Sequence, residues 1–455
     1  MSNVSEARHW RAAQRRARRS VRWEAAREYA AGSLWVLPSV AAVIAVIAGD
    51  AISHIVVQPG TFLDAIAFQG TADDARSLLI AVSSTVVTVI ALVLGLTVVA
   101  LQLSSTQFSP RLLRNFLRDR ATQVVLSVFI ATFVYSAAGL FTVGLQAGAR
   151  TETYPRLAIS VSIVLLFASL GMVVYYADHL VHSIQIDSIN LRIERGTRRV
   201  IADLPVHQVE EIAPHAPAWA TELVAQRSGY VQTIHPELLL PIAAEADVTI
   251  CLRPRVGQHV VAGTTIGWVW AAGPDLPRPV PARFEEAIDT DVLIGFERTL
   301  KQDIAFGIRQ QIDIATKALS PAVNDPYTAI QVIDHLTVVC SDLAIRRLGA
   351  DIRDGPAGRG RVIVPGNTFG DYVLFVTRLL GRYGSGDGDV MLAMLRLLRT
   401  CLEVGGHSVD RLSILTQCVD ELASDAAGGL RRVNDKERVQ AAVEALRARI
   451  NQAAD

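Results

Sequence analysis

The chain has 455 residues, of which 51% are hydrophobic and only 19% charged, and its mean hydropathy is +0.31. This composition is too apolar and too poor in charge for an ordinary soluble protein. The apolar excess lies ahead of Asp178, so the chain has two unlike halves. The formal net charge of zero is an average over both halves and therefore says little about partners. The four cysteines are widely spaced without a CxxC pair, so neither a disulfide framework nor a structural zinc site is indicated.

Residues 1–28 form an arginine-rich arm with three glutamates against its arginines. Beside an apolar helix, such an arm more often lies on anionic lipid headgroups and sets the topology than binds nucleic acid. We therefore expect a basic cytosolic arm and no nucleic-acid partner. A cleavable signal peptide is not expected, because the apolar run that follows is long enough to span a membrane and no convincing A-x-A site closes it.

Four uncharged runs follow, each long enough for a transmembrane helix of about 20 residues. They cover residues 29–49, 77–110, 121–149 and 157–177. As a helix, the second run would extend about 50 Å and exceed the ~30 Å of bilayer hydrocarbon, so its polar end is expected to project beyond the membrane. Residues 29–177 are thus predicted to form a four-helix transmembrane domain.

The loop charges predict the orientation of these spans. Between the first two spans the loop is acidic, with four aspartates against Arg76, whereas the loop after the second span has four arginines against Asp119. Cytoplasmic loops collect arginine. We therefore expect a multi-pass membrane protein with its amino terminus inside and everything after Asp178 in the cytoplasm.

The cytosolic part is predicted to begin with a helical linker over residues 178–227, in which the helix runs to about Leu204. Residues 228–283 form a small β domain, with strands at SGYVQTI and DVTICLRPRVGQHVVAGTTIGWVWA around a short helix at HPELLLPIAAEA. The run VGQHVVAGTTIGWV is similar to the turn region of biotinyl and lipoyl-type barrels. The lysine modified in those carriers is missing, so a spacer or an oligomer contact is favoured over a swinging carrier.

Residues 284–455 are predicted to be mainly helical. The chain is expected to turn helical from Asp291, with a helix that ends at Ser320-Pro321, and the next helix starts at Asn324-Asp325-Pro326, where cap residues precede a proline. A possible strand, RVIVP, follows. Four amphipathic helices are then expected at about residues 369–383, 387–404, 408–425 and 434–451. The predicted fold class is an α-helical membrane protein with a cytosolic α+β region and a carboxyl-terminal helical bundle.

Three stretches of the chain together resemble a known family. The run IGFERTLKQDIAFGIRQQIDIATKALSPAVNDPYTAIQVIDHL, with TQFSPRLLRNFLRD after the second span and YYADHLVHSIQ after the fourth, is similar to the bacterial membrane proteins of domain of unknown function 2254. The similarity covers nearly the whole chain, and the long helical motif is specific. It implies four spans and a cytosolic domain, and it brings no established activity to any residue.

The second span has a polar face, which is the first candidate site. Seven residues recur at alternating steps of three and four and so share one side of a helix: Thr85, Thr88, Leu92, Gly95, Val99, Gln102 and Thr106. Hydroxyls and amides can line a pore, and an apolar ring such as Leu92 or Val99 can gate it by dewetting. Small and hydroxyl residues also let helices pack closely without any conduction, so both interpretations stay open. Four helices are too few for a pore, so a channel requires a homo-oligomer.

Two further constellations are candidates for chemistry. Asp178, His179 and His182 at the inner end of the fourth span could bind a metal or sense pH, although two histidines three residues apart near headgroups more often serve as interface residues. The second is a polar cluster in the family-like motif, which is either a ligand pocket or an ion-pair network. It comprises Glu297, Arg298, Gln302, Asp303, Arg309, Asp313, Asn324 and Asp325.

The absence of known catalytic and nucleotide-binding motifs reduces the number of functions that fit this sequence. The sequence contains no nucleophile elbow, P-loop, HExxH or Rossmann fingerprint, so we expect no enzyme, no cofactor and no pump. The interiors of the four spans carry no ionisable Asp, Glu, Lys, Arg or His, which argues against an energised transporter. The leading hypothesis is a multi-pass protein of the bacterial cytoplasmic (inner) membrane that forms an oligomeric channel for ions or small solutes and has a cytosolic regulatory or assembly domain. The alternative is a non-conducting membrane scaffold or sensor whose cytosolic domain binds a partner.

Overall fold

The computed structural model describes residues 33–55, 57–107, 119–143, 154–206, 210–405 and 408–454. These residues divide into two compact units that meet in the chain between Ser188 and Ile189. We call the first the four-helix unit and the second the α+β unit, and each is described by itself.

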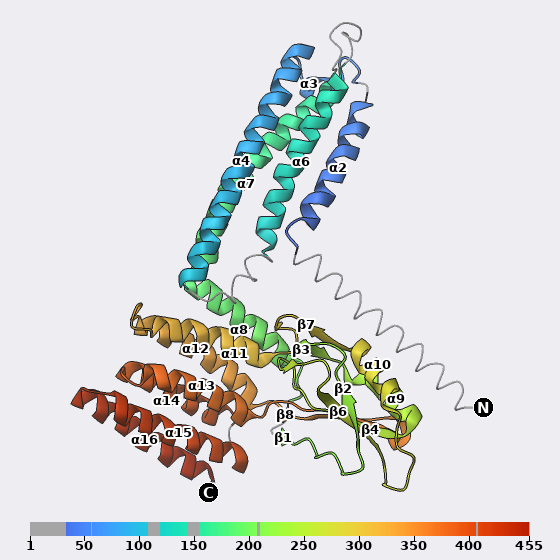
Figure 1. Ribbon diagram of the computed structural model, residues 1–455. Helices are drawn as coiled ribbons and strands as arrows, with labels where there is room; N and C mark the ends of the chain where they lie inside the picture. Colours follow the sequence, from blue (N-terminus) through green and yellow to red (C-terminus); the bar gives the residue numbers. More distant parts are fainter. Residues whose placement is uncertain are drawn as a thin grey trace. The chain divides into compact units, whose positions relative to one another are not determined.

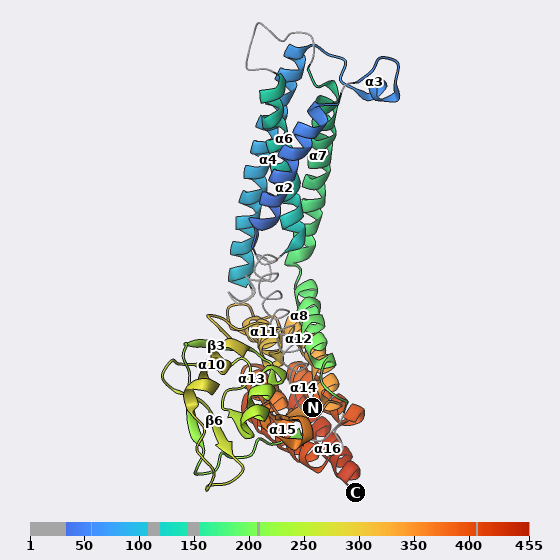
Figure 2. The same cartoon turned by 90° about the vertical axis from the view of Figure 1, so that its right-hand side faces the viewer.

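The four-helix unit contains four helices that are long and apolar enough to cross a membrane, which confirms the four predicted spans. They are α2 (Val36–Ser53), α4 (Ala72–Gln107), α6 (Arg120–Val143) and α7 (Arg156–Ile184), with a short α3 (Phe62–Ile66) between the first two. The long helices lie side by side as a bundle (Figures 1 and 2). Pro38 lies in the first turn of α2, where its missing N–H breaks no helical hydrogen bond.

One face of α4 forms the centre of this bundle. Val82, Val86 and Val93 are buried and belong to one apolar cluster with Phe129 of α6 and Tyr176 of α7. Their spacing of four and seven residues places them on a single side of the helix, as expected for a period of 3.6. The opposite side of α4 is therefore left at the surface of the unit.

Buried hydroxyl groups connect the helices of this bundle. Thr132 and Ser136 of α6 pair with Ser169 and Ser162 of α7, with oxygen–oxygen distances of 2.9 Å in both cases. Tyr176 of α7 lies 2.5 Å from the hydroxyl of a threonine of α4. A polar group without a partner in hydrocarbon costs several kcal/mol. These pairs therefore fix the rotation and register of α4, α6 and α7.

The α+β unit contains two main sheets. The larger has the order β2 (Thr221–Val224), β6 (Thr265–Ala271), β4 (Val248–Leu252), β10 (Arg361–Val364), β9 (Asp351–Asp354), and the smaller has the order β5 (His259–Val260), β3 (Gly229–Ile234), β7 (Val292–Gly295). Two further segments pair in parallel, β1 (Glu210–Glu211) with β8 (Leu348–Gly349). Both main sheets share one apolar core with α9 (Pro236–Ala246) and α10 (Pro281–Asp291).

Strand pairing extends past residue 283, where the β domain was expected to end. β10 pairs in parallel with β4, so that Thr249 lies beside Arg361, and β9 pairs with β10 in turn. The expected helix also does not begin at Asp291. Residues 292–295 form β7, with alternate side chains buried, and Val292 pairs with Ile234 of β3. The prediction that the chain is helical from Asp291 is therefore wrong for residues 292–295, which belong to the smaller sheet.

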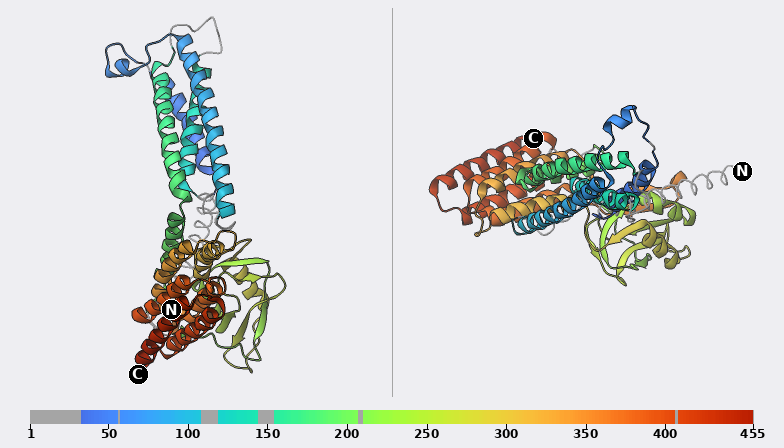
Figure 3. Two further views of the ribbon diagram at one scale, coloured as in Figure 1. Left: turned by 90° about the vertical axis from the view of Figure 1, so that its left-hand side faces the viewer. Right: turned by 90° about the horizontal axis from the view of Figure 1, so that it is seen from above.

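The remaining helices form the other side of the unit, away from the strands (Figures 1 and 3). They are α8 (Ile186–Ala202), α11 (Ile304–Ala318), α12 (Pro326–Ala344), α13 (Phe369–Gly384), α14 (Gly388–Gly405), α15 (Val409–Gly429) and α16 (Val433–Ala454), with a short 3-10 turn, η2, at Pro356–Gly358. The four helices predicted after RVIVP are present within a few residues of their expected bounds. An α+β region and carboxyl-terminal helices thus follow the four apolar helices.

Candidate functional site

The polar face of α4 lies on the outside of the four-helix unit. Thr85, Thr88, Gly95 and Gln102 are all exposed. Leu92 and Val99 on the same face are 56% and 51% exposed, whereas Val86 and Val93 on the opposite face are 1% exposed. The side chain of Thr106 lies outside the described residues. The structure therefore brings six of the seven predicted residues together on one outer surface, facing away from α6 and α7.

Bulky aliphatic residues border this surface. On one flank Val87, Leu94 and Val98 are exposed, as lipid-facing side chains of a membrane helix would be. Beside these residues the surface carries a gap at Gly95, where an added Cβ would meet no atom within 4 Å. The hydroxyl of Thr88 donates to the carbonyl of Ser84 at 3.0 Å, which satisfies part of its hydrogen-bonding capacity within the helix. The outer face of α4 is thus a shallow, hydroxyl-bearing strip.

The three residues at the end of α7 do not converge. His182 and Asp178 form an exposed pair one turn apart, with 3.5 Å between Nδ1 and Oδ1. His179 instead contacts Asp119 beside α6, with 2.6 Å between Nε2 and Oδ2. Across the described ranges, no three His, Cys, Asp or Glu side chains gather as a metal site would require. The sequence did not signal Asp119, because its link to His179 spans sixty residues.

The polar cluster of the family-like motif separates into three places. At the start of α11, Arg298 donates two hydrogen bonds of 2.8 Å to Asp303, and its guanidinium lies 5.3 Å from the ring centroid of Phe306. Asp303 is buried and accepts a hydrogen bond of 2.9 Å from the backbone N–H of Phe306, so it caps the helix. The Oε1 of Gln302 accepts from the N–H of Ile234 at 2.9 Å. These side chains hold the helix start against the smaller sheet.

Glu297 lies just ahead of this group, and its carbonyl accepts a hydrogen bond of 2.8 Å from the side chain of Gln232. Gly257 lies against the same ion pair. It has a φ of +87°, and a Cβ added there would lie 2.1 Å from Oδ2 of Asp303 and 2.8 Å from Nη2 of Arg298. Only glycine provides both the left-handed backbone and the space that this pair occupies.

The other members of the cluster lie further along the chain. Arg309 and Asp313 form an ion pair of 2.7 Å, one turn apart on α11. Asp325 caps α12 and accepts hydrogen bonds from the hydroxyl and the N–H of Thr328 at 2.6 and 3.1 Å. These two bonds lower the pKa of Asp325. Asn324 precedes the cap in a left-handed conformation with φ of +50°.

Gln302 and Asp303 also line a small cavity of about 140 Å³ in the α+β unit, together with residues that the sequence did not single out. Arg255 lies 2.7 Å from Oδ1 of Asn367 and 2.9 Å from Oδ2 of Asp371, and Arg347 is paired with Glu211. The charged groups around the cavity are thus balanced within the chain. The arrangement is that of an ion-pair network between loops.

The sequence contains a signal for the start of α13, the helix whose first turn borders this cavity. Thr368 and Asp371 at the start of α13 form a reciprocal capping box, the pattern that a Ser or Thr followed three residues later by an acidic residue predicts. Burial raises the pKa of the nearby Tyr372 to about 12, so its hydroxyl stays protonated at physiological pH. Arg255 belongs to no such pattern and is identified only by the fold.

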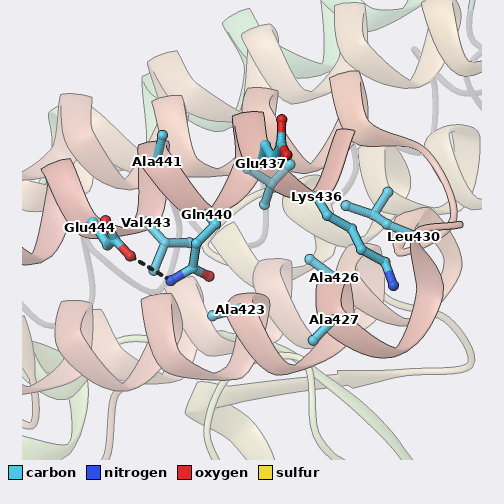
Figure 4. Close-up of a pocket in the computed structure, with 11 residues that line it drawn as sticks. Ala423, Ala426, Ala427, Leu430, Lys436, Glu437, Gln440, Ala441, Val443 and Glu444 are labelled. Atoms are coloured by element: carbon cyan, nitrogen blue, oxygen red, sulfur yellow. Dashed lines mark hydrogen bonds between the residues drawn. The ribbon is translucent and has the colours of Figure 1, made fainter. Parts of the chain in front are cut away.

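A larger groove of about 530 Å³ lies between α15 and α16. Figure 4 shows Ala423, Ala426 and Ala427 of α15 on one side, and Lys436 and Glu444 at opposite ends of the α16 side. The side chain of Gln440 donates to Glu444 at 2.8 Å along the same helix. The described lining residues include no serine, cysteine or histidine, and the ionisable groups are Lys436, Glu437 and Glu444.

These features define a membrane protein with four apolar helices, followed by an α+β region and carboxyl-terminal helices. The family model of the predicted membrane proteins DUF2254 matches residues 31–400, and the chain belongs to this family. The resemblance seen in the sequence motifs is thereby confirmed.

Two mycobacterial proteins are similar to this chain over most of its length. They are uncharacterized protein Mb1321c of Mycobacterium bovis and uncharacterized protein Rv1290c of Mycobacterium tuberculosis. Each is 42% identical over 396 residues, which cover 86% of this chain and 75% of the relative. No solved structure matches the chain.

Proposed function

We propose that the protein is an oligomeric channel for ions or small solutes, in which the outer face of α4 lines a path between subunits. The observation that carries the proposal is the exposure of this face, opposite the buried face of the same helix. Hydroxyl groups on a membrane helix are favoured where protein or water covers them. A second subunit, or a water-filled path bounded by several subunits, supplies that cover.

The composition of the spans supports passive conduction. From Ser77 to Gln107, α4 has no charged side chain, and the other spans are free of ionisable Asp, Glu, Lys, Arg and His between Leu37 and Gly49, Ala121 and Val143, and Leu157 and Ala177. Such spans lack the carboxylates that coupled transporters use. The exposed Leu92 and Val99 lie on the proposed path, where apolar rings gate by dewetting.

The orientation and the remaining assignments belong to the same proposal. The arginines of the first 28 residues and of the loop after α4 support a topology with both termini on the cytoplasmic side of the inner membrane. The α+β unit then lies in the cytoplasm and acts in regulation or assembly. We assign the protein no catalytic activity and no cofactor, since the polar groups of the family-like motif have structural partners within the chain.

A non-conducting scaffold is the second candidate, and one feature of α4 favours it. Ser84 and Thr88, and Ala91 and Gly95, are exposed small residues four apart, the spacing at which membrane helices pack closely. In that case the same face contacts a second copy without enclosing water, and the α+β unit binds a partner.

Cysteine substitution separates the two candidates. The native thiols are buried, and burial raises the pKa of Cys251 and Cys418 to about 11 and of Cys340 to about 12, so they stay unreactive near neutral pH. We would compare Thr88→Cys on the outer face with Leu94→Cys on the aliphatic flank, both at exposed positions of α4. Each variant of the full chain is reconstituted in liposomes and treated with a charged thiol reagent.

A channel predicts cation or solute flux that the reagent blocks in Thr88→Cys and leaves unchanged in Leu94→Cys. Oxidation to cross-linked dimers at Thr88→Cys, without flux in the unmodified protein, supports the scaffold instead. If Thr88→Cys showed neither flux nor cross-linking, both the channel and the scaffold would be contradicted, because the outer face of α4 would then face only lipid.

A further inference from the structure

Helix α8 starts one residue after α7 ends and has two unlike faces. Its buried face carries Ile189, Ile193 and Ile201 together with the polar Glu194. Glu194 accepts a hydrogen bond from Nδ1 of His335 in α12 at 2.6 Å. The helix is therefore anchored to the α+β unit along one side, and its other side is free to contact something else.

The opposite face of α8 is basic. Arg192, Arg195 and Arg199 are exposed and fall at steps of three and four, so they share one side of the helix. None of the three forms an ion pair with any residue of the described ranges. Arg198 is also exposed, but it pairs with Asp342 at 2.7 Å. Most described arginines of this unit have such a carboxylate partner, whereas these three, like Arg431 and Arg432 before α16, have none among the described residues.

The segments outside the described residues contain more basic than acidic residues. Residues 1–32 contain more arginines than glutamates, and residues 108–118 contain three arginines and no acidic residue. Residues 144–153 carry one charge of each sign. The net charge of these segments together is positive, which favours an anionic partner from outside this chain.

We infer that the basic face of α8 binds the headgroups of anionic lipids. Arg192 follows the end of α7 at Ile184 by eight residues of chain, with the extended Gln185 between α7 and α8. Arginine clusters this close to a transmembrane helix are attracted to anionic leaflets, by a factor of about five per residue near the surface. The inference goes beyond the proposed function, because it holds whether or not α4 conducts.

The test uses the full chain with a fluorescent label at Ser188→Cys, on the first turn of α8 and one turn before Arg192. Vesicles contain phosphatidylglycerol and phosphatidylcholine in equal amounts, with bromine, a fluorescence quencher, on only one of the two lipids. We expect brominated phosphatidylglycerol to quench the label at least about twofold more than brominated phosphatidylcholine at low salt. The excess should shrink toward zero near 1 M salt, where the screening length is ~3 Å.

Two sets of substitutions give the specificity. Replacing Arg192, Arg195 and Arg199 with glutamine should abolish the excess quenching, while replacing the three with lysine should preserve it. The matched control replaces Arg431, Arg432 and Lys436, exposed around the start of α16, with glutamine and removes the same charge. This control should keep the excess quenching.

Three results would overturn the inference. They are equal quenching by both lipids, excess quenching that survives the glutamine substitutions on α8, and an equal loss in the control. A label that neither brominated lipid quenches, yet that is shielded from aqueous iodide, would show that a protein surface covers α8. Size-exclusion profiles of each variant check that the fold is intact, and flux through the protein is not part of the readout.

Discussion

The two units use different groups to join their helices. In the four-helix unit the buried links are neutral hydroxyl pairs, such as Thr132 with Ser169 and Ser136 with Ser162. In the α+β unit charged links join helices, such as Arg198 of α8 with Asp342 of α12 and Arg378 of α13 with Glu421 of α15. The difference follows from the surroundings, because an ion is far costlier than a hydroxyl to place among apolar helices. Each unit thus fixes helix register with the strongest polar contact that its surroundings allow.

Arg411 is the extreme case on the charged side. It is 1% exposed, and its guanidinium donates to the carbonyls of Ala344 and Arg346 at the end of α12. It also lies 3.6 Å from Glu210 and 5.1 Å from the ring centroid of Phe369. Desolvation by burial lowers the pKa of Arg411, and the opposite charge of Glu210 offsets part of this effect, while the buried Nε has no hydrogen-bond partner among the described residues. One side chain thereby joins α15, the end of α12, β1 and the start of α13.

The largest effect is therefore expected for Arg411→Met. Removing one partner of a buried ion pair and exposing two helix-end carbonyls should cost about 3–5 kcal/mol of the free energy of unfolding. The measurement is urea unfolding of the full chain in detergent, followed by tryptophan fluorescence, to which Trp219, Trp268 and Trp270 of the α+β unit contribute. Arg399→Met, at an exposed arginine 3.7 Å from Glu403, is the control and should stay within about 0.5 kcal/mol. Equal effects would mean that burial of the charge is irrelevant.

A smaller effect is expected from Gly257→Ala, compared with Gly263→Ala. Both glycines have a positive φ, +87° and +83°, so each alanine bears a backbone cost of about 1–2 kcal/mol. At Gly263 the added Cβ meets no atom within 4 Å, whereas at Gly257 it collides with Asp303. Displacing this cap and ion pair should add about 1–3 kcal/mol in the same unfolding experiment. Equal costs at the two positions would show that the Arg298–Asp303 pair contributes nothing to stability.

The smallest effect concerns the neutral links of the four-helix unit. A double-mutant cycle of Thr132→Val and Ser169→Ala should give a coupling of about 0.6 kcal/mol, the average for polar contacts between membrane helices. The matched cycle combines Thr132→Val with Ser162→Ala, whose hydroxyl bonds Ser136 instead, and should give a coupling near zero. Unfolding in mixed micelles measures both. A coupling as large as the effect of Arg411→Met would remove the contrast between the two units.

The elements that sequence reasoning predicted are those with a local signal. Long apolar runs predicted the four spans, and cap residues such as Asp325 predicted the start of α12. The segment VLIG was taken for helix, because a short apolar run has no period that distinguishes it from a buried strand. Its assignment depends on β3, which pairs with it from sixty residues away. Local pattern cannot contain that information.

The candidate sites show the same limit. The polar face of α4 could be predicted, because residues three and four apart share a side of any helix, but which side faces outward depends on α6 and α7. The motif residues at the start of α11 were singled out, while Arg255 and Asn367 beside them were not. Arg411 was overlooked because arginines are rarely buried, and only its distant carbonyl partners explain its position.

The parallel pairing of β4 with β10 has a consequence for biosynthesis. β4 ends at Leu252, whereas its neighbour on that side starts at Arg361. At about 5–20 residues per second, the ribosome leaves this edge of β4 without its partner for on the order of ten seconds. During that time the strand exposes unpaired backbone groups on which another nascent chain could add a strand. Truncations before Val364 should therefore yield chains that aggregate, even though every helix up to α12 is already complete.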